Sequence, residues 1–217
     1  MMRAHRIVLL IVFVATLIAT AQAQEIEINP FGGGIVSSKV ADTANFKNAA
    51  VYGLRWSVFV IPQFSLEAAV SRQDSFKFKD ASADGRAYIF DLNGLYYFDR
   101  ERVPGPPKKV APFVTVGVGF LSADLKNPQF YVLSGSTATG VQVPPLSAPP
   151  GGRIVRLSDG DRFFTFNYGG GVLASRLAGP LGLRFDARGR TAPNLFGNGA
   201  TFLEISGGFT INFEFPY

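Results

Sequence analysis

Apolar and polar residues alternate one by one along most of this chain after residue 24. The clearest stretch is TFLEISGGFTINFEFPY (residues 201–217), where every second position from Leu203 to Tyr217 is apolar or Gly and most positions between are polar. A period of two residues places successive side chains on opposite faces of a β-strand. No stretch after residue 24 shows the sustained spacing of three and four residues that an amphipathic helix requires, so the pattern predicts strands only.

Eight segments carry this alternation, and Gly, Pro, Asn and Asp separate them. The predicted strands are residues 25–37, 49–61, 64–79, 86–98, 111–124, 161–175, 181–190 and 201–217. The predicted short turns are 61–63, 99–110 and 176–180, and the predicted longer connections are 38–48, 80–85, 125–160 and 191–200. The connection 125–160 is rich in Ser, Gly, Pro and Thr, and a loop of this length is either functional or disordered.

Bulky aromatic residues gather near the ends of the apolar faces. They are Trp56, Phe64, Tyr96, Phe98, Phe213, Phe215 and Tyr217. Aromatic girdles at both water interfaces are typical of a β-barrel in a membrane. The segments also exceed the roughly 5–6 residues of an average soluble strand and suit a tilted crossing, which needs about 9–11 residues.

The opposite faces carry charges of both signs at strand centres. These residues are Arg55, Glu67, Asp91, Arg184, Asp186, Arg188 and Glu204. Every cation among them is Arg, whose planar fork suits bidentate pairing with carboxylates in a buried setting. We therefore expect these seven residues to form an ion-pair network inside a barrel.

The predicted fold is all-β: an eight-stranded antiparallel up-and-down transmembrane β-barrel with a lipid-facing apolar exterior and a polar, charged and filled interior. The sheet must close because an unpaired backbone edge in lipid is costly. Eight strands leave an interior that side chains can fill, which argues against a wide channel. An even strand number places both termini on one side.

The first 23 residues have the pattern of a secretory signal. Arg3 and Arg6 precede the apolar run 7–19, and Ala21-Gln22-Ala23 is a small-x-small cleavage site. An uncleaved anchor is the alternative, but a spanning helix needs about 20 apolar residues. We expect cleavage after Ala23, which leaves residues 24–217 as one barrel domain.

Composition narrows the chemistry. The chain has no Cys, and its one His, His5, lies within the predicted signal. A histidine-dependent hydrolase or acyltransferase and a His or Cys metal site are thereby excluded. Carboxylate chemistry by Glu67 and Asp91 is the remaining enzymatic hypothesis, but their role as counter-ions for arginines is favoured, since buried charges must be paired. We expect no enzymatic activity and no cofactor.

The net charge of +5 without a basic stripe does not indicate a nucleic-acid partner.

The order of several motifs resembles the OmpA-like family of small outer-membrane β-barrels. The residues that carry this resemblance are EINPFGGG (27–34), FSLEAAVSR (64–72), APFVTVGVG (111–119) and the terminal alternation. It implies a place in the bacterial outer membrane with both termini in the periplasm. The implied partners are outer-membrane lipids, lipopolysaccharide, the outer-membrane assembly machinery and periplasmic chaperones, and the implied state is a monomer.

The terminal alternation also resembles the signal that the assembly machinery reads. Its residues are Phe209, Ile211, Phe213, Phe215 and Tyr217. Two features depart from the usual pattern. Pro216 cannot donate a ladder hydrogen bond, and the last residue is Tyr rather than Phe.

Three functions stay open at this point. The first is a non-enzymatic barrel with a structural or surface-interaction role through its extracellular loops, above all 125–160. The second is a narrow pore for small solutes or ions, and the third is a soluble secreted lipocalin-like barrel that binds an apolar ligand. On the loop side, four cations are candidates for contact with lipopolysaccharide phosphates: Lys77, Lys79, Arg153 and Arg156.

Overall fold

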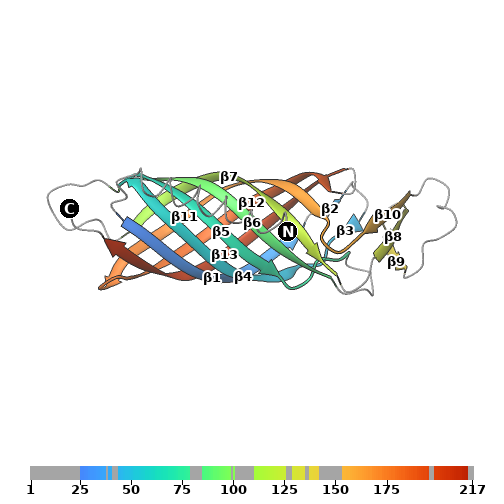
Figure 1. Cartoon of the computed structure of the whole chain (residues 1–217), viewed down its shortest axis with the longest axis horizontal. Helices are drawn as coiled ribbons and strands as arrows, with labels where there is room; N and C mark the ends of the chain where they lie inside the picture. Colours follow the sequence, from blue (N-terminus) through green and yellow to red (C-terminus); the bar gives the residue numbers. More distant parts are fainter. Residues whose placement is uncertain are drawn as a thin grey trace, which may run out of the picture.

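Eight long strands form a closed barrel in the computed structural model. It describes residues 25–37, 39–40, 44–78, 85–98, 100, 110–125, 129–134, 137–141, 153–195 and 198–214. The barrel strands are β1 (Glu25–Ser37), β4 (Ala49–Ile61), β5 (Phe64–Gln73), β6 (Arg86–Tyr97), β7 (Val110–Asp124), β11 (Arg162–Ala178), β12 (Leu181–Leu195) and β13 (Asn198–Glu214). Figure 1 shows them side by side and strongly tilted.

Each barrel strand pairs antiparallel with the next barrel strand along the chain, and β1 pairs with β13 to close the ring. The closing register runs from Glu25 opposite Glu214 to Ser37 opposite Phe202. The predicted all-β, eight-stranded antiparallel up-and-down barrel is confirmed. No strand edge of the barrel is left unpaired, which is the condition for a sheet surrounded by lipid.

The two ends of the barrel differ. At one end, called the turn end, short turns at 62–63 and 179–180 join neighbouring strands, and β1 begins and β13 ends there. The other, called the loop end, carries the short strands β2 (Lys39–Val40), β3 (Ala44–Asn45), β8 (Gln129–Ser134), β9 (Thr137–Val141) and β10 (Arg153–Leu157). Within the described residues, no helix is long and apolar enough to cross a membrane.

Four expected strand boundaries differ from the structure by three residues or more. One is the end of β11, which extends to Ala178 into the predicted turn 176–180. The segment predicted as 64–79 ends as a strand at Gln73, and Phe78 beyond it makes only an isolated bridge to Phe46. The connection predicted at 191–200 is mostly strand, because β12 extends to Leu195 and β13 begins at Asn198. Pro and Gly in this stretch indicate a loop, but the β12–β13 ladder absorbs them through an irregularity between Ala192 and Leu195.

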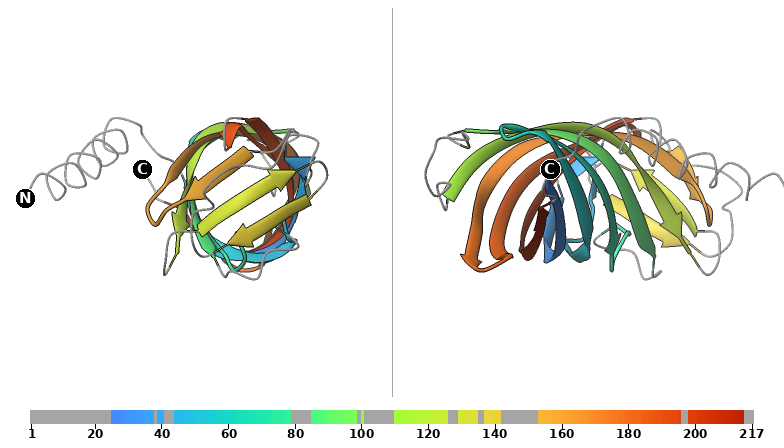
Figure 2. Two further views of the ribbon diagram at one scale, coloured as in Figure 1. Left: turned by 90° about the vertical axis from the view of Figure 1, so that its right-hand side faces the viewer. Right: turned by 60° about the vertical axis from the view of Figure 1, so that its left-hand side comes forward.

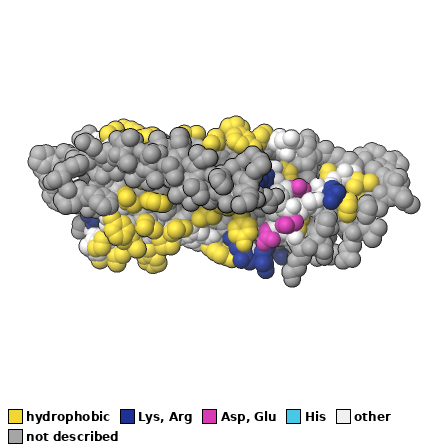
Figure 3. Space-filling model, in the orientation of Figure 1, with side chains coloured by type: hydrophobic (Ala, Val, Ile, Leu, Met, Phe, Trp, Pro, Cys, Tyr) yellow, Lys and Arg dark blue, Asp and Glu magenta, His cyan; other side chains and the backbone are white. Residues whose placement is uncertain are grey.

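The apolar faces of the strands point outward. Val116 is 67% exposed, Phe209 is 66% exposed and Phe185 is 61% exposed, whereas the charged Arg55 is 1% exposed. Hydrophobic side chains cover the visible barrel wall toward the turn end, and most visible charged side chains gather toward the loop end (Figure 3). The predicted apolar exterior is confirmed. The soluble lipocalin-like alternative is excluded, since it requires the aromatic face to line the interior.

The expected girdle aromatics follow this assignment where they can be placed. Trp56, Tyr96, Phe98 and Phe213 are exposed on the outer wall, and Phe64 is half-buried there. Phe215 and Tyr217 lie outside the described residues.

Apolar clusters close the interior at both ends, with polar residues between them. On β6 the inward order is Ala87 and Ile89 at the loop end, then Asp91 and Asn93, then Leu95 and Tyr97 at the turn end. The turn-end cluster is Phe59, Leu95, Tyr97, Ala111, Phe113 and Leu173. The larger loop-end cluster includes Phe31, Ile35, Phe46, Phe76, Phe78, Leu121, Tyr131, Leu157 and Phe202. The charged interior is thus shielded from water on both sides.

A three-stranded sheet in the order β10–β8–β9 covers the mouth at the loop end. Figure 2 (left) shows these strands crossing in front of the ring. From this cap sheet, Tyr131 and Leu157 are fully buried in the loop-end cluster, and the Tyr131 ring lies 4.9 Å from that of Phe78. Part of the 125–160 connection, for which the sequence left function and disorder open, is therefore ordered structure that contacts the barrel core.

The orientation of the wall makes a depth-dependent prediction. Val116→Arg, at the middle of β7, should make insertion less favourable by about 2–4 kcal/mol, whereas the same charge at Phe213, near the turn end, should cost about 1 kcal/mol or less. The measurement is refolding yield into lipid vesicles, read from heat-modifiable migration on gels. Equal tolerance of the two arginines would contradict the assignment of the outer wall to lipid.

Candidate functional site

Charged side chains fill the middle of the barrel. Five carboxylates and four guanidiniums are buried there: Glu27, Glu67, Asp91, Asp186 and Glu204 with Arg55, Arg184, Arg188 and Arg190. They come from β1, β4, β5, β6, β12 and β13. All seven residues proposed from the sequence lie within this group. Glu27 and Arg190 complete it and were missed, although each continues the inward face of its strand, two residues before Asn29 and two after Arg188 respectively.

Asp186 lies at the centre of the network. Its Oδ1 accepts hydrogen bonds from Arg188 Nη2 at 2.7 Å and Arg184 Nη2 at 3.0 Å. Its Oδ2 accepts from Arg55 Nη1 and from Arg184 Nε, both at 3.1 Å. One carboxylate thus binds three guanidiniums, which would repel one another without it.

Glu67 provides the second anchor, from the far side of the barrel. Its carboxylate lies 2.8 Å from Arg184 Nη1 and 3.0 Å from Arg188 Nη1. Asn93 donates its side-chain amide to the same carboxylate at 2.8 Å. These contacts tie β12 to β5 and β6 through the interior, where no backbone ladder joins them.

A third group of contacts extends the network toward the loop end. Arg190 binds Asp91 with both terminal nitrogens, at 2.5 and 2.7 Å. Glu204 accepts from Arg55 Nη2 at 3.0 Å and lies 3.5 Å from Arg190. The two parallel hydrogen bonds from Arg190 to Asp91 are the strongest form of an arginine–carboxylate contact.

Aromatic rings cover the cations where the charged layer meets the apolar clusters. The guanidinium of Arg55 lies 3.6 Å from the ring centre of Phe31, and that of Arg184 lies 4.6 Å from Phe113. At the turn end, Arg100 lies 3.7 Å from the Phe59 ring and donates to both oxygens of Glu25 at 2.9 Å. Stacking of this type stabilises a desolvated cation, so the apolar clusters and the ion pairs support each other.

The strands β7 and β11 contribute no charge to this layer among the described residues. They present Gly117, Gly119, Gly169 and Gly171 to the interior instead. A methyl group at Gly117 would collide with the Asn93 side chain, and one at Gly119 with Asp91. The absence of side chains on this wall is therefore required for the charged residues opposite to fit.

The network has one negative charge in excess. Five carboxylates against four guanidiniums leave a count of 5 − 4 = 1 if all groups are ionised. Glu27 is the least satisfied carboxylate: Oε1 lies 3.2 Å from Arg184, and Oε2 has no hydrogen-bond partner among the described residues. The other four carboxylates are bound by arginines at 3.0 Å or less.

The arrangement favours counter-ions over catalysts. Glu67 and Asp91 have their oxygens occupied by arginines, so neither is placed to move a proton on a substrate. Among the described residues, no group of three or more His, Cys, Asp or Glu is placed to hold a metal ion.

The remaining predicted site residues lie apart from the network. Arg156 is exposed on β10 of the cap sheet, 5.9 Å from the Phe130 ring, and Lys77 is half-buried after β5. Lys79 and the side chain of Arg153 lie outside the described residues. In the predicted assembly signature, Phe209 and Phe213 are exposed on β13 and Ile211 is half-buried, whereas Phe215 and Tyr217 lie outside the described part.

Known proteins resemble this chain in structure only. No protein-family model and no curated protein sequence matches it. Neisserial surface protein A superimposes with a TM-score of 0.51 and 13% identity, over 87% of this chain and 96% of its own. The outer membrane protein OprG from Pseudomonas aeruginosa gives 0.51 and 11%, over 89% and 97%. The chain has the fold of the small outer-membrane β-barrels. The resemblance expected from the sequence motifs is thereby confirmed at the level of the fold.

The unequal roles of the carboxylates can be tested by paired substitutions. Asp186→Asn should destabilise the barrel by about 3–5 kcal/mol, because three buried guanidiniums lose their shared anion. Glu27→Gln should cost about 1 kcal/mol or less, since it removes the excess charge and one weak contact. The measurement is urea unfolding in vesicles, followed by emission of the single Trp, Trp56, which lies on the outer wall. Equal costs for the two variants would mean that the charge count does not control stability.

Proposed function

We propose that this chain is a non-enzymatic barrel of the bacterial outer membrane with a structural or surface-interaction role carried by its loop end. The observation that supports this most directly is the filled and doubly capped interior. Buried ion pairs occupy the middle, and apolar clusters occupy both ends. The interior side chains bind one another, so contacts with other molecules fall to the outer surface and the loops.

The proposed orientation places the turn end and both termini in the periplasm. Short turns at the periplasmic side and longer loops outside are the rule for such barrels, and β1 begins and β13 ends at the turn end. Export through the predicted signal 1–23 and delivery by periplasmic chaperones to the assembly machinery are part of this proposal. The terminal alternation from Phe209 to Tyr217 would be read there. A ring with no unpaired barrel edge needs no partner strand, which supports a monomer.

The surface role is assigned to the cap sheet. It joins two barrel strands that are themselves direct neighbours, β7 and β11, so the chain between Asp124 and Arg162 is not needed to close the barrel. Lys77, Arg153 and Arg156 belong to this end. As part of the same proposal, we assign Lys77, Lys79, Arg153 and Arg156 contacts with lipopolysaccharide phosphates.

A narrow pore is the second candidate, favoured by one observation. The buried side chains of Thr115, Thr165 and Asn167 have no hydrogen-bond partner among the described residues. Such groups are normally satisfied by ordered water, so this wall of the interior is suited to hold water. The apolar clusters at both ends argue against a continuous wet path.

Planar-bilayer recording separates the two candidates. We expect the refolded chain 24–217 to give no steady unitary current at moderate voltage, while gels of the same preparation show heat-modifiable migration. Steady unitary currents would favour the pore and make the arginine-rich interior a selectivity filter. Failure to insert at all would overturn the outer-membrane proposal itself.

Replacement of residues 129–157 by a short Gly-Ser linker tests the role of the cap sheet. Because Arg162 already pairs with Ser122 in the barrel, we expect assembly and heat-modifiability to survive this change. The binding of cells bearing the shortened chain to surfaces or ligands then reports what the cap contributes. Loss of assembly would show that the cap belongs to the folding core and not to a separable surface element.

A further inference from the structure

Three arginines lie on the outer wall where the apolar band ends at the loop end. We call Arg72, Arg86 and Arg162 the arginine belt. Arg72 is next to last in β5, and Arg86 and Arg162 are the first residues of β6 and β11. Along each strand, the next outward position toward the membrane is apolar: Val70, Tyr88 or Phe164. The belt thus marks the boundary between the lipid-facing surface and the loops.

Strand register brings the belt together across the wall. Arg72 lies opposite Tyr52 on β4 and opposite Tyr88 on β6, and Tyr88 in turn lies opposite Ser122 on β7. Ser122 then lies opposite Arg162 on β11, which completes one continuous row. On β6, Arg86 is the next outward-facing residue after Tyr88 in the direction of the loop end. Only β7 separates Arg86 from Arg162, a distance of about 10 Å between strands, so two phosphate groups can be contacted at once.

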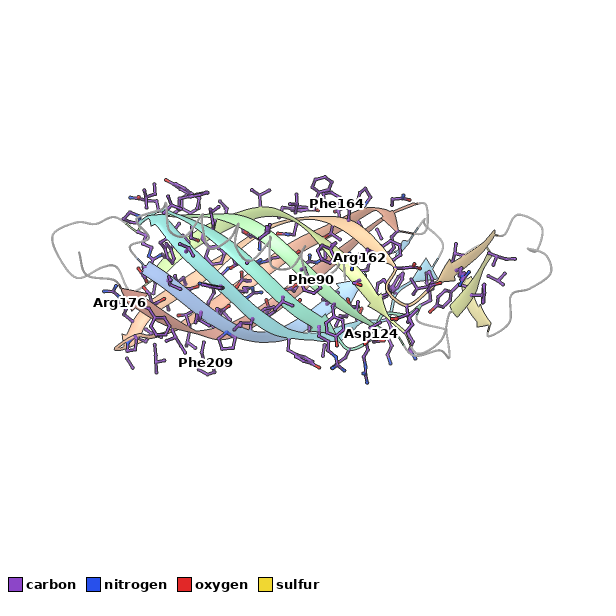
Figure 4. The ribbon with its side chains drawn as sticks, viewed as in Figure 1. Phe90, Asp124, Arg162, Phe164, Arg176 and Phe209 are labelled. Atoms are coloured by element: carbon purple, nitrogen blue, oxygen red, sulfur yellow. The ribbon has the colours of Figure 1, made fainter. Side chains whose placement is uncertain are left out.

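An aromatic surface lies directly on the membrane side of the belt. Phe90 and Phe120 stack with ring centres 4.8 Å apart, and Phe164 and Phe166 meet edge to face at 4.8 Å. All four are more than a third exposed. The guanidinium of Arg162 lies 5.7 Å from the Phe120 ring. In Figure 4, Arg162 and Asp124 lie nearer the loop end than Phe90.

The belt keeps positive charge for a ligand. Neither Arg86 nor Arg162 forms an ion pair within the described part of the chain. Arg72 lies 3.5 Å from Asp74; the Arg72 side chain is half-buried and that of Asp74 is exposed, and ion pairs at the water interface contribute little. Asp124 lies opposite Arg86 in the ladder. On the outward face, Arg72, Arg86 and Arg162 against Asp74 and Asp124 leave a net charge of 3 − 2 = +1. Asp161, the residue before Arg162, is not in this count, and its carboxylate accepts a hydrogen bond from the Ser158 amide at 2.7 Å.

We propose that the arginine belt binds the phosphate groups of lipid A, the glycolipid of the outer leaflet, while the aromatic surface beneath packs on its acyl chains. This rests on the proposed outer-membrane location with the loop end outside. Guanidinium forks match phosphate oxygens in geometry and charge. Aromatic residues mark the depth at which lipid headgroups begin. An anion with acyl chains attached satisfies both halves of this surface, which a free phosphate does not.

The test uses the whole mature chain in nanodiscs of neutral phosphatidylcholine that contain a small fraction of bis-phosphorylated lipid A. Native mass spectrometry counts the lipid A that stays bound. Replacement of all three belt arginines by Gln should weaken retention on the order of tenfold. Lipid A from which both phosphates have been removed should bind the native chain as weakly as normal lipid A binds this variant.

Arg176→Gln is the matched control for Arg162→Gln. Both residues lie on β11, at its opposite ends, and both changes remove one positive charge. We expect only Arg162→Gln to reduce retention. Arg162→Lys, which keeps the charge but loses the fork, should fall between native and Gln. Equal retention of lipid A by the native chain and the Gln variants would overturn the proposal that the arginine belt binds its phosphates.

Two readings in the same samples separate this proposal from the one it rests on. Heat-modifiable migration and Trp56 emission report insertion whether or not lipid A is present. In matched nanodiscs, phosphatidylglycerol takes the place of lipid A. Normal insertion with equal retention of the two lipids would overturn the lipid A assignment and leave the barrel proposal standing. Failure of the native chain to insert would overturn both.

Discussion

The carboxylate of Asp186 holds three guanidinium groups together in the middle of the barrel, and the rest of the interior is arranged around that contact. Arg184 and Arg188 extend from Asp186 to Glu67 on the opposite wall, and Arg55 extends to Glu204. Charges this deeply buried are tolerated only when each is paired and hydrogen-bonded. The glycines of β7 and β11 and the apolar clusters at both ends meet this requirement, because they provide room for the network and keep water from it.

Because the ion pairs that stabilise the barrel also fill its interior, the interior has no room for a ligand. A barrel of eight strands has just enough interior for side chains, and here those side chains are bound to one another. The outer wall is apolar over its length and changes character only where the belt begins. Specific contacts with other molecules are therefore left to the loop end, where the cap sheet packs its apolar residues on the mouth and turns Arg156 outward.

The sequence predicted the wall more fully than the interior. Alternation placed the first two strands at 25–37 and 49–61, as the structure has them, since a two-residue period is a local property. It also placed the seven charged residues on the inward face. It did not reveal that Arg190 binds Asp91, or that one oxygen of Glu27 has no hydrogen-bond partner among the described residues. Both facts depend on the register between strands far apart in the chain. The cap sheet was missed since its composition is that of a loop.

The long separation in sequence between the partners of the network has a consequence for synthesis and transport. The partners of the network are separated by 131, 149 and 157 residues along the chain. Contacts between such distant segments form late in folding. A nascent or truncated chain lacking β12 and β13 would lack the partners that Glu27, Arg55 and Glu67 have in the folded barrel, and such a chain is poorly soluble in lipid. Insertion into the bilayer therefore becomes favourable only after β12 and β13 are present, so the bilayer selects complete chains over truncated ones.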